Sequence, residues 1–552
     1  MALYRLRTYD HTRMHPVKYL SSGECPLHNI AEPLISFCRR RWGNRVAQGK
    51  LIYGGQLVCR WSASGSPTID KGALYEEDGR IVAIGAFDDL QRRYPMARQI
   101  GGLDYIVMPG FVNSHSHGRG VTTYQVGQPD EPLELRLVEI FHRAESNRKA
   151  AASSKQASDR FAYLDTLYSC AKQLASGITT TVHSHIYLDG TVESLAGSAR
   201  PIIEAYRDSG MRCAFALGIR DRNSFTFLDD EEFFATLPPA LRDSLDLRSS
   251  RHYVAVDEYL GLVRDLVASC PTVSFQLGPW NPIFCSDKLL EALALASRRE
   301  GWRIQTHLNE TRHQAAYGLR QHGKSWVRYL REIGMLTERF SGAHGVWLED
   351  GDIEAIAQSG AQVVYNPGSN LRLQSGLAPV RDLLCGGVKV GFGLDSLSLN
   401  DDDDMFQDLR FGQLIQGSWG IDGESISGDA MLEMATVTGA SIAGIEGIGA
   451  LSEGGCADVV LLSRVEMESP QNERPLPEQI LKRARGADVK TVIVGGRVMI
   501  EDGRWTGRDP ADLFHELAAA KTAGSRELPP SVFAMKEAVR SYVNEAELQF
   551  KQ

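Results

Sequence analysis

The chain has 552 residues, of which 43% are hydrophobic and 23% are charged, as in ordinary globular proteins. This composition excludes a mainly disordered chain, a collagen-like chain and a coiled coil, and no apolar run reaches the roughly 18 residues that a membrane-spanning helix needs. The formal net charge of −9 argues against a nucleic-acid partner, because proteins that bind nucleic acids usually present a basic face.

Cysteine usage and the start of the chain bear on location. Nine cysteines are spread thinly, without a Cys-x-x-Cys pair, so a disulfide framework is not expected and a reducing compartment is favoured. The first residues, MALYRLRTYDHTRMH, lack the apolar segment of a secretory signal. We therefore expect a cytoplasmic protein.

Residues 1–47 show weak periodicity and a run of three arginines, but no motif. Basic clusters are usually solvated surface, so we expect an N-terminal extension of unknown role, with an RNA- or partner-binding arm as the alternative. At the other end, residues 508–552 predict a helical tail that packs or mediates oligomers, with a lid over the substrate pocket as the alternative.

The sequence pattern changes at residue 48. Residues 48–105 and 441–507 consist of short β-rich runs separated by glycine and Asp-Gly turns. Two distant segments of the same style predict one small composite β-sandwich domain built from both flanks. The middle, 106–440, is then a single inserted domain.

That middle alternates eight short apolar runs with helix-like segments. Strands that alternate with helices indicate βαβ units around a parallel sheet. Eight units are the number of a closed (β/α)8 TIM-type barrel, so we predict an α/β fold of this kind. An open doubly wound sheet is the alternative, but it favours a glycine-rich phosphate loop after the first strand, where this chain has His-Ser-His.

Barrel enzymes place their catalytic groups at the carboxyl ends of the strands. Four predicted strands end in side chains that can bind a metal or move a proton. These side chains are His115 and His117, His307 with Glu310, His344, and Asp395. One His-x-His pair is a weak signal, but residues two apart in a strand share a face, and four such strand ends together predict a metal site.

Five motifs then resemble the amidohydrolase superfamily: PGFVNSHSHG, QTHLNET, SGAHGVWL, VVYNPGSNLRLQSGLAPV and GFGLDS. They are most similar to its branch of cytosine, guanine and adenosine-derivative deaminases and atrazine-type chlorohydrolases. The resemblance covers about residues 50–505. It implies a (β/α)8 barrel flanked by a composite β domain, and a metal-dependent hydrolase.

The resemblance implies a role for each of these residues. Its metal ligands fall on His115, His117, His307 and Asp395. Glu310 would move a proton to the leaving group, His344 would orient the water or polarise the substrate, and Asp395 would also accept a proton from the water. Imidazoles and a carboxylate suit Zn²⁺, and Fe²⁺ is possible; either ion lowers the pKa of a bound water.

The number of metal ions follows from the fourth strand. Binuclear relatives commonly have a carboxylated lysine or a carboxylate there, whereas this strand reads VSFQLGPW. We therefore expect one divalent ion per chain.

Two other positions depart from the family pattern. Trp280 stands where many deaminases have His or Arg, and Ser396 follows Asp395 where the family often has glycine.

Substrate contacts are the least specified part of the site. His183 and His185 end the second strand and could contact substrate, form a structural pair or bind a second metal. Trp280 lines the pocket or belongs to the core, and Asn366 is a loop candidate for a polar contact.

We expect a metal-dependent amidohydrolase that hydrolyses a C–N bond and deaminates an amino-substituted N-heterocycle. The alternative is cleavage of an amide-, urea- or carbamate-type bond, or of a C–Cl bond, in a xenobiotic-like molecule. A non-catalytic scaffold should have lost a ligand or the glutamate, and none is missing. We also expect a small-molecule substrate, a homo-oligomer, and neither nucleic-acid nor membrane partners.

Overall fold

The computed structural model describes residues 49–550 apart from several short segments. These are 152–154, 189, 223–229, 245–251, 419, 466, 468–473 and 521–527, and side chains at 144–151 and 545–550 are also left out. The predicted N-terminal extension, 1–47, lies outside the described residues. Residues Ala47–Gln552 form one compact unit. Within the described part, no helix is both long and apolar enough to span a membrane.

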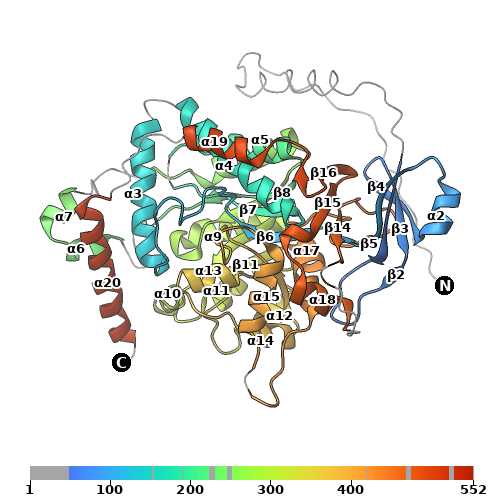
Figure 1. The fold of residues 1–552 in the computed structure, drawn as a ribbon. Helices are drawn as coiled ribbons and strands as arrows, with labels where there is room; N and C mark the ends of the chain where they lie inside the picture. Colours follow the sequence, from blue (N-terminus) through green and yellow to red (C-terminus); the bar gives the residue numbers. More distant parts are fainter. Residues whose placement is uncertain are drawn as a thin grey trace, which may run out of the picture. The chain divides into compact units, whose positions relative to one another are not determined.

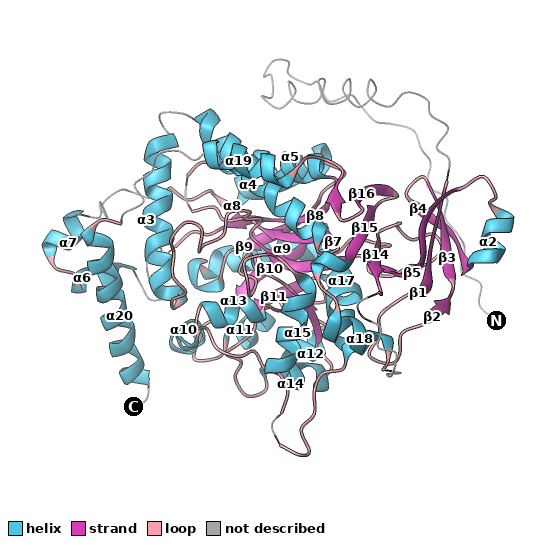
Figure 2. Cartoon of the chain, in the orientation of Figure 1, coloured by secondary structure: helices cyan, strands magenta, loops and turns pink. Residues whose placement is uncertain are grey.

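Eight parallel strands form the barrel (Figure 2). They are β6 (Phe111–Ser116), β7 (Ile178–Ser184), β8 (Arg212–Ile219), β9 (Ser274–Pro279), β10 (Arg303–Leu308), β11 (Phe340–His344), β12 (Gln362–Tyr365) and β13 (Lys389–Phe392). Each strand pairs with the next in chain order. Between β13 and β6, Asp395 N donates to His115 O at 2.9 Å, which nearly closes the barrel. The predicted fold class is confirmed.

Nine further strands form a single mixed sheet beside the barrel. They are β1 (Lys50–Val58), β2 (Thr68–Asp70), β3 (Gly72–Glu77), β4 (Arg80–Ala86), β5 (Arg98–Pro109), β14 (Val459–Ser463), β15 (Val489–Val494), β16 (Arg497–Glu501) and β17 (Arg504–Trp505). Figure 1 shows strands from both flanks side by side, and β14 pairs antiparallel with β5. The two flanks therefore share one continuous sheet.

The change from one sheet to the other falls at Gly110. The apolar run at 106–109, placed in the barrel domain by the sequence, continues β5 and pairs with β14, and the barrel begins at Phe111. A Cβ at Gly110 would lie 2.3 Å from the Thr179 side chain. A residue without a side chain is therefore needed where the chain passes between the two sheets.

Most helices lie around the barrel, whereas the first, α2, packs on the flanking sheet beside β3 and β4 (Figure 1). In chain order they are α2 (Phe87–Arg93), α3 (Leu133–Ala151), α4 (Lys155–Ala175), α5 (Val192–Ser209), α6 (Asp230–Thr236), α7 (Pro239–Ser244), α8 (Val256–Ser269), α9 (Asp287–Glu300), α10 (Arg312–His322), α11 (Trp326–Glu332), α12 (Asp352–Ser359), α13 (Pro367–Arg372), α14 (Val380–Cys385), α15 (Met405–Ile415), α16 (Gly428–Glu433), α17 (Gly439–Ala443), α18 (Leu476–Arg483), α19 (Pro510–Ala520) and α20 (Pro530–Phe550). Short helical turns are η1 (Pro282–Phe284), η2 (Met434–Thr438) and η3 (Gly486–Asp488).

Helix α9 shows how the sequence sets these boundaries. Ser286 begins the helix, and its hydroxyl accepts from Leu289 N, while Gly301 ends it in the left-handed conformation with φ 75°. Leu289 and Leu293, four residues apart, are buried on one face. The helix thus covers the barrel with its apolar side.

One end of the barrel interior is apolar. Val112, Val182 and Val364 from three strands pack with Ala440 and Ile442 of α17. This packing fills the barrel, so polar groups must gather at the other end, where the strands finish.

The C-terminal part, 508–552, contains α19 and α20. Helix α19 packs on α4, and α20 packs on α3 and α6 through an apolar cluster that includes Val532, Met535 and Leu135. Lys536 is buried in this contact and forms ion pairs with Glu131 and Glu139 at 2.6 and 3.2 Å.

Candidate metal centre

Four side chains from three strands converge at the carboxyl end of the barrel. They are His115 and His117 at the end of β6, His307 on β10, and Asp395 after β13. One donor atom of each lies within 4.8 Å of all the others. These strands are far apart in the sequence, and barrel closure brings their ends together.

The three imidazoles are held by acceptors outside the cluster. His115 Nδ1 donates to Gln305 Oε1 at 3.0 Å, His117 Nδ1 to Ser184 O at 2.7 Å, and His307 Nδ1 to Trp280 O at 2.5 Å. Each proton is thereby assigned to Nδ1, so each Nε2 lone pair is turned toward the cluster. This is the tautomer that a metal-binding histidine requires.

The nitrogen and oxygen atoms of the cluster are arranged as the ligands of a cation would be. His307 Nε2 and His117 Nε2 lie 3.4 Å apart, although both carry lone pairs in this tautomer. Asp395 Oδ1 lies 3.2 and 3.1 Å from Nε2 of His115 and His117. His115 Nε2 and Asp395 Oδ1 are also buried without a hydrogen-bond partner. Buried polar atoms rarely stay unsatisfied, and a divalent ion among three imidazoles and a carboxylate would satisfy all four.

The electrostatics favour the same protonation states. Burial, followed by the nearby imidazoles, holds the pKa of His307 well below its ordinary value, so the ring is neutral. Burial alone would raise the pKa of Asp395, but the adjacent imidazoles of His115 and His117 hold it well below the usual range. Neutral imidazoles and an ionised carboxylate are the forms that bind metal ions.

Glu310 and His344 complete the cluster on one side. His344 Nε2 lies 3.7 Å from Glu310 Oε2 and 4.0 Å from Asp395 Oδ2. Burial lowers the pKa of His344 to about 4, and its Nδ1 donates to Asn370 Oδ1 at 2.8 Å. Burial, Asp395 and Glu134 raise the pKa of Glu310 well above its ordinary value. The cluster thus pairs a neutral imidazole with a carboxyl group that favours its protonated form.

The backbone at these positions is unusual. His344, Asp395, Ser396 and Asn309 have φ of 78°, 53°, 60° and 47°, in the left-handed region that non-glycine residues seldom adopt. Such residues gather at functional sites, where surrounding contacts over-determine the conformation. Here they lie just beyond the strands or at a strand end, close to the cluster in sequence.

The structure does not bring His183 and His185 to the cluster. His183 Nδ1 is hydrogen-bonded to Tyr206 OH at 3.0 Å, and its ring stacks on Phe215. His185 Nε2 lies 3.3 Å from Ser198 Oγ. Tyr206 and Ser198 belong to α5. Both imidazoles therefore contact α5, and a contact of either with substrate stays a prediction.

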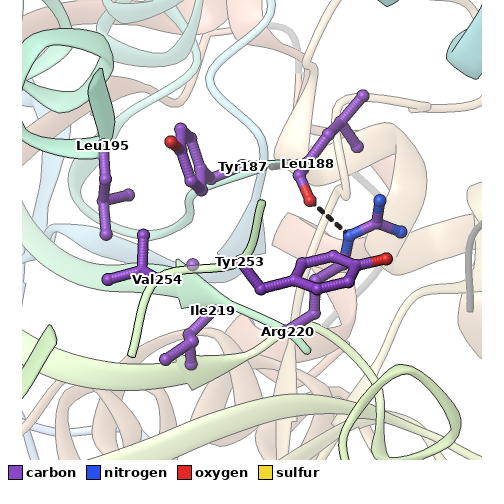
Figure 3. Close-up of a pocket in the computed structure, with 8 residues that line it drawn as sticks. Tyr187, Leu188, Leu195, Ile219, Arg220, Tyr253 and Val254 are labelled. Atoms are coloured by element: carbon purple, nitrogen blue, oxygen red, sulfur yellow. Dashed lines mark hydrogen bonds between the residues drawn. The ribbon is translucent and has the colours of Figure 1, made fainter. Parts of the chain in front are cut away.

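Trp280 meets the cluster through its backbone. Its carbonyl accepts from His307, while its ring is 7% exposed and stacks on Phe284 with a centroid separation of 4.9 Å. The Arg220 guanidinium lies 5.4 Å from the indole centroid. Figure 3 shows Arg220 in a pocket beside Tyr253, with its Nε donating to a backbone carbonyl. The indole is thus part of an aromatic group around an arginine.

Asn366 does reach the cluster. It is fully buried, and its Nδ2 lies 3.4 Å from His344 Nδ1. Three further residues that the sequence did not single out also serve the cluster. Ser369 Oγ donates to Asp395 Oδ2 at 2.5 Å, Gln305 holds His115, and Glu134 acts on Glu310.

The sequence contains a pattern that could have identified two of these three residues. Gln305 stands two residues before His307 on one strand, so strand alternation puts both on the same face. Ser369 lies within the NPGSN motif. Nothing in the sequence marks Glu134, because it approaches Glu310 only through the packing of α3.

A parallel barrel with a histidine–aspartate cluster and a buried glutamate at its carboxyl end defines a class of metal-dependent hydrolases. Residues 106–499 match the amidohydrolase family, and the chain belongs to that family. It is therefore a hydrolase acting on carbon–nitrogen bonds other than peptide bonds. The resemblance noted in the sequence is confirmed.

One curated relative and two solved structures show what the chain is similar to. The chain is 30% identical over 464 residues to a 5'-deoxyadenosine deaminase of Methanothermobacter thermautotrophicus, covering 83% of this chain and 96% of the relative. It resembles in fold an adenosine deaminase from Xanthomonas campestris with bound zinc, with TM-score 0.67, 22% identity, and 85% and 97% of the two chains covered. An atrazine chlorohydrolase from Arthrobacter aurescens complexed with zinc gives TM-score 0.67 and 22% identity over 85% and 99%.

Proposed function

We propose that this protein is a deaminase that replaces the exocyclic amino group of an N-heterocycle, of the adenine type, with oxygen from water. One observation carries the proposal. Three Nε2 atoms and a carboxylate converge within 4.8 Å, beside a buried second carboxyl group, Glu310. The deaminase named among the curated relatives supports adenosine-like substrates over other heterocycles.

The proposed cofactor is one Zn²⁺ ion per chain, with Fe²⁺ as the second choice. Its ligands are His115, His117, His307 and Asp395. When bound, the ion makes water acidic enough to act as a nucleophile near neutral pH. A single ion is favoured because β9, the fourth barrel strand, contains neither lysine nor carboxylate and the cluster supplies one set of four donors.

The chain's own residues would handle the protons. Asp395 accepts the first proton from the attacking water, while its Oδ2 is held by Ser369. Protonated Glu310 gives its proton to the ring nitrogen, then takes the hydroxyl proton of the adduct and passes it to the departing amine, so that ammonia leaves as a neutral molecule. The proton held by Asp395 then returns to Glu310, which restores the starting state of both groups. His344 donates through Nδ1 to Asn370, which leaves Nε2 as an acceptor that orients the water.

Turnover by the zinc-loaded protein tests the proposal. The panel contains adenosine, 5'-deoxyadenosine, free aminopurines, aminopyrimidines, a chlorotriazine, a phenylurea and an anilide. We expect ammonia, and a product in which oxygen replaces the amino group, from an adenine nucleoside. Cleavage of the urea or anilide, or chloride release, with every amino-heterocycle untouched would refute deamination and support the other reaction that the same donor set permits.

The predicted homo-oligomer and the predicted extension 1–47 stay predictions. Light scattering of the full chain, and of a variant lacking residues 1–47, gives their masses in solution. A monomer in both cases would contradict the oligomer. A change in the number of subunits on removing the extension would assign residues 1–47 to assembly.

A further inference from the structure

We propose that the hydroxyl of Ser396 is a positioning group that fixes Asp395 relative to His115 and His117, and so sets the affinity of the site for its metal ion. The inference rests on the proposed function, because it takes these residues as metal ligands. It assigns a role to a position where the chain departs from the family pattern.

Three of the four proposed ligands lie at the ends of β6 and β13, which meet where the described barrel has no paired strand ladder. β6 supplies His115 and His117, and Asp395 follows β13, whereas β6 pairs with β7 and β13 with β12. Across the junction, Asp395 N donates to His115 O at 2.9 Å and Leu394 N donates to the Asn113 side chain at 3.0 Å. The separation of ligands therefore depends on a few individual contacts.

Ser396 Oγ provides several of these contacts. It accepts from His117 N at 3.1 Å and from Arg119 N at 3.4 Å, and lies 3.0 Å from Ser116 Oγ. A hydroxyl has two acceptor sites and one proton, so Ser396 donates its proton to Ser116. Ser116 Oγ in turn accepts from Gly118 N at 3.1 Å. One oxygen thus holds the turn that carries His117.

The backbone indicates that the hydroxyl, and not the conformation, is the reason for a serine here. Ser396 has φ 60° and follows Asp395 with φ 53°, so two successive non-glycine residues occupy the left-handed region. Glycine would adopt that conformation without steric strain. A side chain retained in a strained conformation, with all its hydrogen-bonding capacity used, is typical of a residue kept for its contacts.

A second set of contacts links the segments that follow β6 and β13, so the effect of Ser396 can be tested without unfolding the protein. Arg372 of α13 forms ion pairs with Asp130 before α3 and Asp401 after β13, and its Nη1 donates to Ser398 O. The same two segments are therefore linked further out as well. Loss of one hydroxyl should leave the fold intact and alter the ligand geometry only.

The experiment compares Ser396→Ala and Ser396→Gly with a matched control, Ser398→Ala. Ser398 Oγ accepts from Asp403 N within its own loop and does not reach the β6 segment. Zn²⁺ affinity is measured by competition with a chromophoric chelator, and ligand geometry by the visible spectrum of the Co²⁺ form. Circular dichroism of the metal-free proteins verifies folding.

We expect both Ser396 variants to bind Zn²⁺ about 10- to 100-fold more weakly, with an altered Co²⁺ spectrum, and Ser398→Ala to match the wild type. Wild-type affinity in Ser396→Ala would overturn the inference, and so would restored affinity in Ser396→Gly, which would assign the effect to the backbone. A wild-type protein that binds no metal would instead overturn the proposed function.

Discussion

Asp408 lies under the loop that carries Asp395, and its ionisation makes a quantitative test of the structure. It is fully buried on α15, where Oδ1 accepts from Leu399 N at 3.0 Å and Oδ2 has no hydrogen-bond partner. Burial, and then the neighbouring carboxylates, raise its pKa from 3.8 to about 8. Asp408→Asn keeps the shape and the acceptor and removes the ionisation.

The sign follows from linkage. The native state keeps the proton to about pH 8, while the unfolded chain releases it near pH 3.8, so unfolding releases a proton between these values. Stability therefore falls as pH rises across that window, by about 1.4 kcal/mol per pH unit. At pH 7 the buried, protonated Asp408 therefore lowers the free energy of unfolding of the wild type by at most about 4 kcal/mol. Asp408→Asn does not have this cost.

Thermal unfolding at pH 5 and pH 8 measures the effect. We expect Asp408→Asn to melt above the wild type at both values, by a margin that grows with pH. The control is Asp422→Asn, because Asp422 is exposed, does not act on Asp408 and should give no pH-dependent margin. A margin independent of pH, or a variant less stable than the wild type at pH 8, would refute a neutral buried Asp408.

Three further variants test other contacts. Glu310→Gln should keep the metal and lose about 10²- to 10⁴-fold in turnover, and unchanged turnover would remove Glu310 as the proton carrier. Gln305→Leu deletes the acceptor of His115 Nδ1–H and should weaken Zn²⁺ binding about 10- to 100-fold by chelator competition. Lys536→Met leaves the buried Glu139 short of a partner and should destabilise α20 by about 1–3 kcal/mol, seen as faster hydrogen exchange there. Arg540→Met, in an exposed pair on the same helix, is its control.

The barrel could be predicted because its signal is local and repeated. Each of the eight apolar runs became a strand, even β13, which is four residues long. The cluster could be predicted for the same reason, since parallel strands bring their carboxyl ends together whatever their separation in sequence. The boundary at Gly110 could not, because the run from Ile106 to Ser116 is continuous in sequence and divides between two sheets only through tertiary pairing.

The residues that position the histidine–aspartate cluster were harder to predict, because their partners are distant in the sequence. Gln305 and His115 are 190 residues apart, and Ser396 and Ser116 are 280 apart. Such pairs form only when the barrel closes. Short motifs identify residues with metal-binding chemistry, but give no information on which hydroxyl or amide will face them.

Strand register explains why two identical His-x-His patterns have different roles. Ser116 of β6 pairs with His183 of β7, and in parallel strands paired residues point to the same side of the sheet. Side chains alternate along a strand, so His115 points opposite to Ser116 and therefore opposite to His183. His115 thus faces the barrel interior, while His183 faces Tyr206 of α5. A shift of one residue in β7 would turn His183 toward the barrel interior, and the sequence alone does not specify that register.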